Sequence, residues 1–127
     1  SRQGVNCIPV PAPSLSLHLM GSVQIVDSGL ALVRAESVDR EIMAVMSKKG
    51  IKTGAIAENQ EVEERHAMNI VTIAPGRVIM PSGCPVTRKV YERHGIEVVA
   101  EVETSELANG GGGLACATGI LLREAAL

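Results

Sequence analysis

An order of predicted elements that occurs twice constrains the fold of this chain more than any other feature. Residues 22–34 contain two short apolar runs separated by a turn cluster at residues 27–29, which predicts two strands joined by a tight turn. Apolar positions over residues 38–46 then follow with helical spacing, and Gly50 ends that segment. A further apolar stretch, residues 50–57, predicts a third strand. The first half of the chain therefore forms a strand–strand–helix–strand unit.

Residues 69–81 begin a second copy of this order, with two apolar runs divided by a Pro-Gly pair. Residues 85–94 again have helical spacing, and Gly95 precedes the apolar stretch 96–102. The two copies are offset by 45 to 48 positions. A period of this length indicates a repeat architecture, in which each unit covers its apolar face with a neighbour. We therefore predict an α+β fold built from a repeated unit.

The length and composition limit the chain further. With 127 residues and 13.3 kDa we expect a single domain over residues 1–127. Tyr91 is the only aromatic residue, so the core must consist mainly of aliphatic side chains. The net charge is −2 and both signs are interleaved, which leaves neither a basic stripe nor a stacking platform. We predict no nucleic-acid partner.

The amino-terminal stretch, residues 1–21, is apolar but is interrupted by three prolines, so it predicts a strand or extended arm rather than a helix. It has the features of neither a signal peptide nor a membrane span, and we expect no membrane partner. The cysteines, Cys7, Cys84 and Cys116, are odd in number and form no CxxC pair. This pattern argues against a disulfide framework or a zinc site and favours a reducing, cytoplasmic compartment.

Two further segments have a composition of their own. Residues 58–66 are strongly acidic and compatible with a helix, and we interpret them as a solvated helical turn on the surface. Residues 114–124 predict a last strand, entered through the four consecutive glycines 110–113.

The glycine run leads to the first candidate for chemistry. Its spacing fits neither a dinucleotide-binding loop nor a phosphate-binding loop, but glycine lets a backbone approach a ligand closely, and the run delivers the chain to Cys116. A flexible connection is the alternative interpretation. His18 lies in an alternating apolar and polar stretch, where a histidine of the core is the alternative to a catalyst. Together the two residues would form a thiolate–imidazole pair if the fold brought them into one cleft.

The remaining cysteines and histidines are weaker candidates. Cys84 precedes Pro85 at the start of a predicted helix, where a thiol pKa can be lowered, but we favour a packing role. Cys7 is expected to pack in its strand. His66 and His94 lie in charged surface contexts, and we assign them no role.

Four segments, in their order and spacing, resemble the carboxy-terminal half of the guanidine-modifying enzymes of the pentein superfamily. Among these enzymes the chain looks most like the dimethylarginine dimethylaminohydrolases and related arginine deiminases. The segments are LHLMGSVQIVDSGLALV (17–33), MNIVTIAPGRVIMP (68–81), VTRKVYERHGIEVV (86–99) and SELANGGGGLACATGILL (105–122).

The resemblance implies a fold, a reaction and site residues. Penteins are propellers of five strand–strand–helix–strand units, so this chain would be a partial propeller of two to two and a half units. Cys116 matches the nucleophile and His18 the general acid and base, with a covalent thiouronium intermediate and no cofactor or metal. Asn69, Gly113 and Leu114 match positions expected to contact substrate, although a turn role for Asn69 is equally compatible.

The chain also departs from the family pattern. Met20 stands where arginine deiminases and amidinotransferases have an aspartate that grips the guanidinium, which favours the dimethylaminohydrolase branch. The family's amino-terminal half, with the orienting acid, is not within this chain. We expect that half to come from a second copy of this chain in a homo-oligomer, from a second chain, or from a segment lost to proteolysis. Within this chain, Glu61, Glu63 and Glu64 form the only acidic cluster that offers carboxylates.

We therefore expect a hydrolase that cleaves a C–N bond of a guanidine, such as a methylated arginine. Arginine deiminase or amidinotransferase activity is an alternative. A non-catalytic half-propeller that serves in binding or assembly is another.

Overall fold

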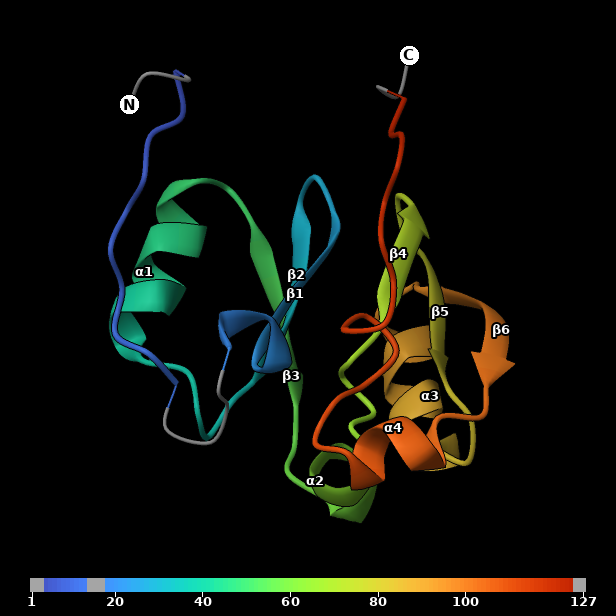
Figure 1. Ribbon diagram of the computed structural model, residues 1–127. Coiled ribbons are helices and arrows are strands. Elements are labelled where there is room, and N and C mark those ends of the chain that lie inside the picture. The colour runs from blue at the N-terminus through green and yellow to red at the C-terminus, as the bar shows by residue number, and fades with distance from the viewer. Residues whose placement is uncertain (1–3, 14–17, 125–127) are drawn as a thin grey trace.

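Two three-stranded sheets, side by side, form the frame of the molecule (Figure 1). The computed structural model describes residues 4–13 and 18–124. The elements in chain order are η1 (Leu19–Gly21), β1 (Val23–Asp27), β2 (Leu30–Arg34), α1 (Arg40–Lys48), β3 (Lys52–Ile56), α2 (Gln60–Glu64), β4 (Val71–Ala74), β5 (Arg77–Pro81), α3 (Pro85–Arg93), β6 (Glu97–Val102) and α4 (Ser105–Asn109).

The first sheet has the order β1-β2-β3, with β1 antiparallel and β3 parallel to β2. The turn between β1 and β2 is held by Asp27, whose carboxylate accepts a hydrogen bond from the Ser28 backbone N–H at 2.6 Å. Helix α1 makes the crossover to β3. Asp39 caps its amino terminus by accepting from the Glu41 N–H, and Gly50, with φ +73°, turns the chain after its last residue.

The second sheet repeats this topology with the order β4-β5-β6 and α3 as the crossover helix. Pro85 occupies the first turn of α3, where its missing N–H costs no hydrogen bond. Gly95, with φ +77°, follows the helix as Gly50 follows α1. The predicted repeat of two strand–strand–helix–strand units and the α+β fold class are confirmed.

The two units meet along β1 and β4. The Gly76 N–H, in the turn after β4, donates to the Val26 carbonyl at 2.8 Å, and the Thr72 hydroxyl donates to the Ile25 carbonyl at 3.3 Å. Strand β2 lies at the centre of the first sheet, and its residues alternate between two packing partners. Leu32 faces the core shared by both units, whereas Ala31 and Val33 face α1. The units are therefore packed against one another, as a repeat architecture requires.

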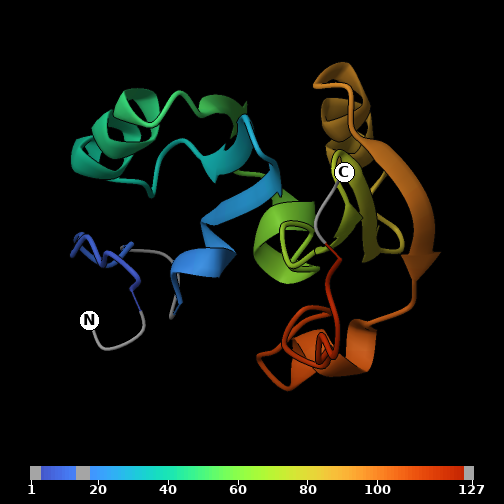
Figure 2. The same ribbon diagram turned by 90° about the horizontal axis from the view of Figure 1, so that it is seen from above.

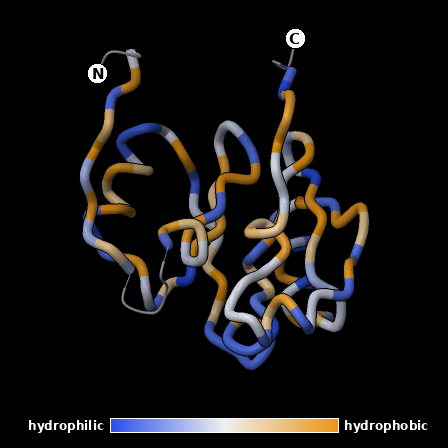
Figure 3. The backbone as a smooth tube through the Cα atoms, in the orientation of Figure 1, coloured by the Kyte–Doolittle hydropathy of each residue, from blue (hydrophilic) through white to orange (hydrophobic). Residues whose placement is uncertain are grey.

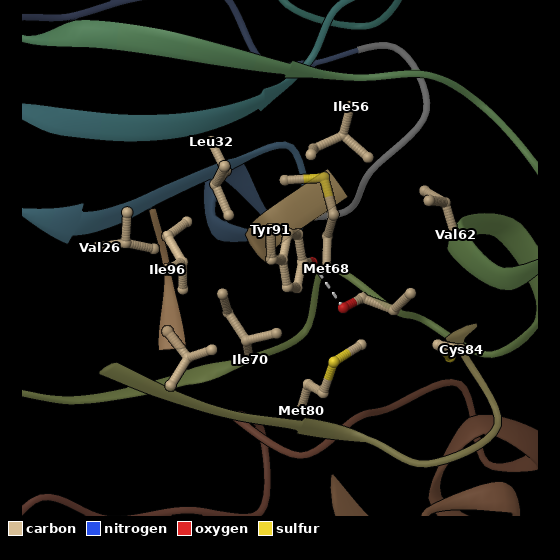
Figure 4. Close-up of a cluster of buried hydrophobic side chains, with 12 residues drawn as sticks. Val26, Leu32, Ile56, Val62, Met68, Ile70, Met80, Cys84, Tyr91 and Ile96 are labelled. Atoms are coloured by element: carbon tan, nitrogen blue, oxygen red, sulfur yellow. Dashed lines mark hydrogen bonds between the residues drawn. The ribbon is translucent and has the colours of Figure 1, made fainter. Parts of the chain in front are cut away.

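Tyr91 on α3 lies inside the shared core, fully buried, with aliphatic side chains from both units around it (Figure 4). Its hydroxyl donates to the Ala67 carbonyl at 2.8 Å, the contact drawn as a dashed line in Figure 4. A buried tyrosine needs such a partner, because an unpaired hydroxyl would cost free energy on burial. Burial raises the pKa of Tyr91 above its ordinary value, so the phenol stays protonated.

The acidic segment forms α2 and the hydrophilic lower end of the molecule in Figure 3. The predicted helical turn is confirmed, but its fully solvated character is not. Val62 is buried, because it packs into the shared core. Asn59 caps the helix by accepting from the N–H groups of Glu61 and Val62.

The carboxy-terminal end of the chain differs from the sequence-based expectation, whereas the described part of the amino-terminal end agrees with it. Residues 114–117 form a turn and residues 118–124 form no strand, so the predicted last strand is wrong for the described residues. Helix α4 was not anticipated. Residues 4–13 have neither helix nor strand, which fits an arm, and residues 1–3 and 14–17 of the predicted arm lie outside the described residues. No helix in the described ranges combines the length and apolar character that a membrane crossing requires.

Candidate active site

Residues of η1, α2 and the segment after α4 line a cavity of about 400 Å³. Figure 2 shows these three parts of the backbone near one another. Both residues of the predicted thiolate–imidazole pair, His18 and Cys116, line it. The fold therefore brings two side chains that are 98 positions apart in sequence to one cavity. The described residues of its lining are His18, Met20, Gly21, Arg34, Val62, Glu63, His66, Met68, Asn69, Gly111 and Cys116.

Cys116 lies in the turn 114–117 with an exposed, free thiol. Asn69 contacts this turn twice. Its side-chain N–H donates to the Cys116 sulfur at 3.3 Å, and its carbonyl oxygen accepts from the Ala115 backbone N–H at 2.6 Å. One amide side chain therefore fixes both the backbone before the thiol and the sulfur itself. Asn69 takes part in a turn and also lines the cavity, and its contact with substrate stays a prediction.

Gly113 makes this arrangement possible. A Cβ atom at Gly113 would overlap the side chain of Asn69, with the Asn69 Cγ nearest and its Cβ at 2.7 Å. Such an overlap requires a backbone shift, because the neighbour is the branched amide and not a flexible chain end. The glycine run is thus a place of close approach, as expected, although the neighbour is the amide of Asn69. Gly113 and Leu114 are not part of the described lining, and their contact with substrate stays a prediction.

His18 precedes η1 with an extended backbone, and its side chain is exposed to the cavity. The Gly21 N–H donates to the His18 carbonyl at 3.0 Å, which closes the single turn of η1. The alternative of a histidine packed in the core is excluded by this exposure. Met20, on the same turn, also lines the cavity and is 41% exposed, so the position where deiminases have an acid is apolar here.

The acidic segment contains four glutamates, and the three that the sequence analysis singled out have different environments. Glu63 lines the cavity and is the only carboxylate among the described residues that do so. Glu61 turns to the amino terminus of α3 and accepts from the N–H groups of Val86 and Thr87. Glu64 accepts a hydrogen bond from Gln60 on its own helix, at 2.9 Å.

Arg34, at the end of β2, contributes a buried ion pair to the wall of the cavity. Its guanidinium binds both carboxylate oxygens of Glu58, at 2.7 and 2.5 Å, and the two side chains are only 10% and 11% exposed. The hydrogen bond to Glu58 holds the pKa of Arg34 above its ordinary value against the opposing effect of burial. The pair is locally neutral, and sequence analysis missed it because its partners are 24 positions apart.

His66 is a second residue that sequence analysis missed, since no role was assigned to it. It lines the cavity, half-buried, and its Nδ1 lies 2.6 Å from the Gly112 carbonyl oxygen. Among the described residues it is the only non-glycine with a positive φ, +51°. His94, by contrast, is exposed on the surface as expected.

The other two cysteines do not belong to this cavity. Cys84 is fully buried, and burial, assisted by the nearby Glu61 charge, raises the pKa of its thiol to about 11. The lowering that a helix start can produce is absent, and the packing role is confirmed. Cys7 is exposed and lies in no strand, so its expected packing is wrong. The described residues include no group of three metal-ligating side chains.

A family model described as "Arginine deiminase" matches residues 24–123, which is most of the chain. The chain belongs to the arginine deiminase family. Among curated proteins, an arginine deiminase from Borrelia garinii subsp. bavariensis is 46% identical over 56 residues, covering 44% of this chain and 13% of the relative. An arginine deiminase from Borreliella burgdorferi is 45% identical over 56 residues, with the same coverage of both chains. An uncharacterised protein from Aeropyrum pernix is 39% identical over 54 residues, covering 42% and 20%.

Two solved structures relate this member of the arginine deiminase family to other enzymes. An inosamine-phosphate amidinotransferase from Streptomyces griseus has a TM-score of 0.75 at 19% identity, over 91% of this chain and 35% of that one. A dimethylarginine dimethylaminohydrolase has a TM-score of 0.56 at 29% identity, over 80% and 36%. The pentein resemblance and the partial propeller are thereby confirmed. The chain spans about a third of these structures and a smaller share of the curated relatives it matches.

Proposed function

We propose that this chain carries the nucleophile and the general acid–base of an enzyme that hydrolyses a C–N bond in the guanidinium group of arginine or a methylated arginine. The observation that carries this proposal is the shared cavity of Cys116 and His18. Membership in the arginine deiminase family supports the reaction class. The paired residue types support the mechanism, because a resonance-stabilised guanidinium carbon requires a polarizable nucleophile and its departing amine requires a proton.

The reaction would proceed in two stages. The Cys116 thiolate attacks the guanidinium carbon to form a C–S bond, and the C–N bond breaks as the His18 imidazolium gives its proton to the leaving nitrogen. The resulting thiouronium is then attacked by water, which gives one proton to His18. As the C–S bond breaks and the thiolate returns, the second proton is lost to solvent, where the released amine takes one up.

The cavity supplies groups for both stages. The Asn69 amide N–H, 3.3 Å from the Cys116 sulfur, stabilises negative charge on the attacking atom. The Glu63 carboxylate is suited to hold the cationic substrate, because Glu58 already neutralises Arg34 in the wall. Glu63 would assist, within this chain, the orienting acid expected from the amino-terminal half.

Two observations bear on the substrate in opposite directions. Met20 places a thioether in the lining where an acid would grip an unsubstituted guanidinium, and an apolar wall favours N-methyl groups, as in a dimethylarginine dimethylaminohydrolase. The family model and the Borrelia relatives, named arginine deiminases, favour arginine itself. An amidinotransferase would use an amine instead of water in the second stage. The products separate these three reactions.

The chain exposes an apolar surface that further units could cover. The large apolar side chains Ile25, Ile73, Leu121 and Leu122 are between 49% and 100% exposed along β1, β4 and the segment after the cavity turn. In the similar solved structures this chain corresponds to about a third of the length. The remaining units, from a longer chain, a second chain or a second copy, would cover this surface.

The test uses the chain in its native assembly, whose composition is first established by intact mass in solution and by denaturing mass analysis. Arginine, dimethylarginine and arginine with glycine as amine acceptor are supplied in turn. Ammonia, dimethylamine, citrulline and the amidino product are then quantified. A hydrolase gives citrulline with ammonia or dimethylamine, and acid quenching traps an adduct on Cys116.

The matched variants are Cys116→Ser and Cys84→Ser. We expect the first to lose turnover by at least about a thousandfold, and the second to retain it because its sulfur is buried outside the cavity. Absence of turnover by the complete assembly with every guanidine would favour a binding or assembly module. Turnover that survives Cys116→Ser would refute the mechanism.

A further inference from the structure

The segment that carries Cys116 is held at two points by one turn of the chain. His66 and Asn69 are the ends of that turn, which the Asn69 N–H closes by donating to the His66 carbonyl at 2.7 Å. The His66 ring contacts the Gly112 carbonyl, and the Asn69 side chain contacts Ala115 and Cys116. The two side chains thus bind the segment at Gly112, before the thiol, and at Cys116 itself.

The middle of this turn is fixed in the core. Ala67 and Met68 are 0% and 2% exposed, and the Ala67 carbonyl accepts the Tyr91 hydroxyl at 2.8 Å. The Ala67 N–H donates to the Glu61 carbonyl at 3.0 Å. Because its middle is immobilised by packing and by hydrogen bonds, the turn can present the flanking His66 and Asn69 side chains in one orientation.

The backbone of His66 shows that its place is specific. Its φ of +51° lies in the left-handed region, which is unfavourable for a residue that carries a side chain. Asparagine, aspartate and histidine adopt this region more readily than other non-glycine residues. A glycine would relieve the strain, but it would leave no side chain to reach Gly112.

The contact also defines the protonation of the ring. A carbonyl oxygen only accepts hydrogen bonds, so Nδ1, at 2.6 Å from the Gly112 oxygen, must carry the proton. In the neutral ring Nε2 then holds the lone pair. His66 therefore uses one nitrogen as a donor to the backbone of the glycine run, while its ring lines the cavity.

We propose that His66 is a positioning residue for Cys116, which fixes the glycine run by donating a hydrogen bond from Nδ1 to the Gly112 carbonyl. The run needs such a tie, because consecutive glycines leave the backbone with the greatest freedom in the region that leads to the thiol. Asn69 fixes the sulfur end of the segment and His66 fixes its start. This inference rests on the proposed role of Cys116, but its structural part can be tested without turnover.

The experiment compares His66→Asn with His66→Gly. Both replacements tolerate the left-handed backbone, but only asparagine retains a donor, since its side-chain nitrogen is as many bonds from the backbone as Nδ1 of histidine. Hydrogen–deuterium exchange of the native assembly is followed on the peptide that contains residues 110–118. We expect exchange there about tenfold faster in the glycine variant and near wild type in the asparagine variant, with β2 and α3 unchanged.

Turnover provides the second measurement. The glycine variant should lose kcat by about tenfold to a hundredfold with KM changed little, and the asparagine variant should recover most of it, because misplacement of the nucleophile affects the chemical step. Equal exchange in all three proteins would overturn the inference, as would an asparagine variant that behaves like the glycine variant. If neither the wild type nor either variant turns over guanidines but hydrogen exchange changes as expected, the proposed function is wrong and the positioning role of His66 is supported.

Discussion

Cys84 shares a core cluster with residues between Gln60 and Asn69, and Cys116 contacts Asn69, yet the two thiols differ in burial and in their polar neighbours. Cys84 is fully buried at the start of α3, next to the Glu61 carboxylate that serves the same helix. Cys116 is exposed in a turn at a cavity, with the amide of Asn69 against its sulfur. One stretch of chain therefore supports a packing cysteine at one end and a candidate nucleophile at the other.

The difference shows that proximity to a helix start does not by itself activate a thiol. At Cys84 the favourable N–H groups of α3 are taken by Glu61, whose negative charge and the loss of water both oppose a thiolate. At Cys116 the amide of Asn69 donates a hydrogen bond to the sulfur, and the thiol stays exposed to solvent. The two cysteines therefore differ in reactivity because of their burial and because hydrogen-bond donors among the described residues face only one of the two sulfurs. Their position within a helix or turn matters less.

The largest expected effect is on alkylation. A pKa of about 11 leaves Cys84 with a thiolate fraction of about a thousandth at pH 8, and packing also blocks the reagent. We expect iodoacetamide to modify Cys116 in the native protein at pH 8 at least about a thousandfold faster than Cys84. Peptide mass spectrometry over time gives both rates. In denaturant the two cysteines should react alike, and rapid native modification of Cys84 would contradict the comparison.

The next effect tests the close approach behind Cys116. Gly113→Ala forces a Cβ into the Asn69 side chain and displaces the segment, so we expect guanidine turnover to fall by about a hundredfold. Gly112→Ala is the matched control, because a Cβ there would meet its nearest neighbours at 3.7 and 3.8 Å, an ordinary contact. Its turnover should remain within about threefold of wild type. Comparable losses in the two variants would argue against Asn69 as the reason for the glycine.

Periodicity and turn residues predicted the parts of this molecule that are stabilised locally. Both hairpins, both crossover helices and their terminal glycines, Gly50 and Gly95, follow from patterns within a few residues. The glycine run and the residue types suggested Cys116 and His18 as a pair, and the family resemblance supplied their expected roles. The ion pair of Arg34 with Glu58 and the contact of His66 with Gly112 join residues 24 and 46 positions apart, and no local pattern signals such contacts.

The predicted strand over residues 114–124 failed for a related reason. Its apolar composition resembles a strand, but a strand also requires a neighbour to pair with. Ile120, Leu121 and Leu122 are 55%, 100% and 79% exposed, so the apolar side chains find no cover among the described residues. The apolar composition of a segment shows that it can be buried, but a strand forms only where the fold offers an adjacent strand to pair with.

A smaller effect is expected on stability, from the Glu61 carboxylate that binds the start of α3 near Cys84. Burial tends to raise the pKa of Glu61, but the hydrogen bonds from Thr87 and Val86 outweigh it and leave the pKa below its usual value. Stability from this carboxylate is therefore complete above about pH 4.5 and is lost as the pH falls through the lowered pKa of the folded state. Glu61→Gln should lower the free energy of unfolding at pH 7 by about 1–2 kcal/mol and flatten its dependence on pH below 4.5.

Urea unfolding between pH 3 and pH 7 measures this effect. Glu64→Gln is the control, because Glu64 only accepts from Gln60 on an exposed face, and its change should stay within about 0.5 kcal/mol. Equal losses in the two variants would mean that the cap on α3 contributes nothing beyond surface charge.

The smallest effect is expected from the hydrogen bond between the Tyr91 hydroxyl and the Ala67 carbonyl, which lies between the surroundings of the two cysteines. Tyr91→Phe keeps the ring but leaves the buried Ala67 carbonyl without its donor, which should cost about 1 kcal/mol in urea unfolding. Because Ala67 lies between His66 and Asn69, amide exchange over residues 110–118 should also rise slightly, by about twofold, while Cys84 stays protected from alkylation. An unchanged free energy of unfolding would mean that the Tyr91 hydroxyl does not stabilise the fold. If instead Cys84 becomes reactive toward iodoacetamide, Tyr91 couples the surroundings of the two cysteines more strongly than their separate packing implies.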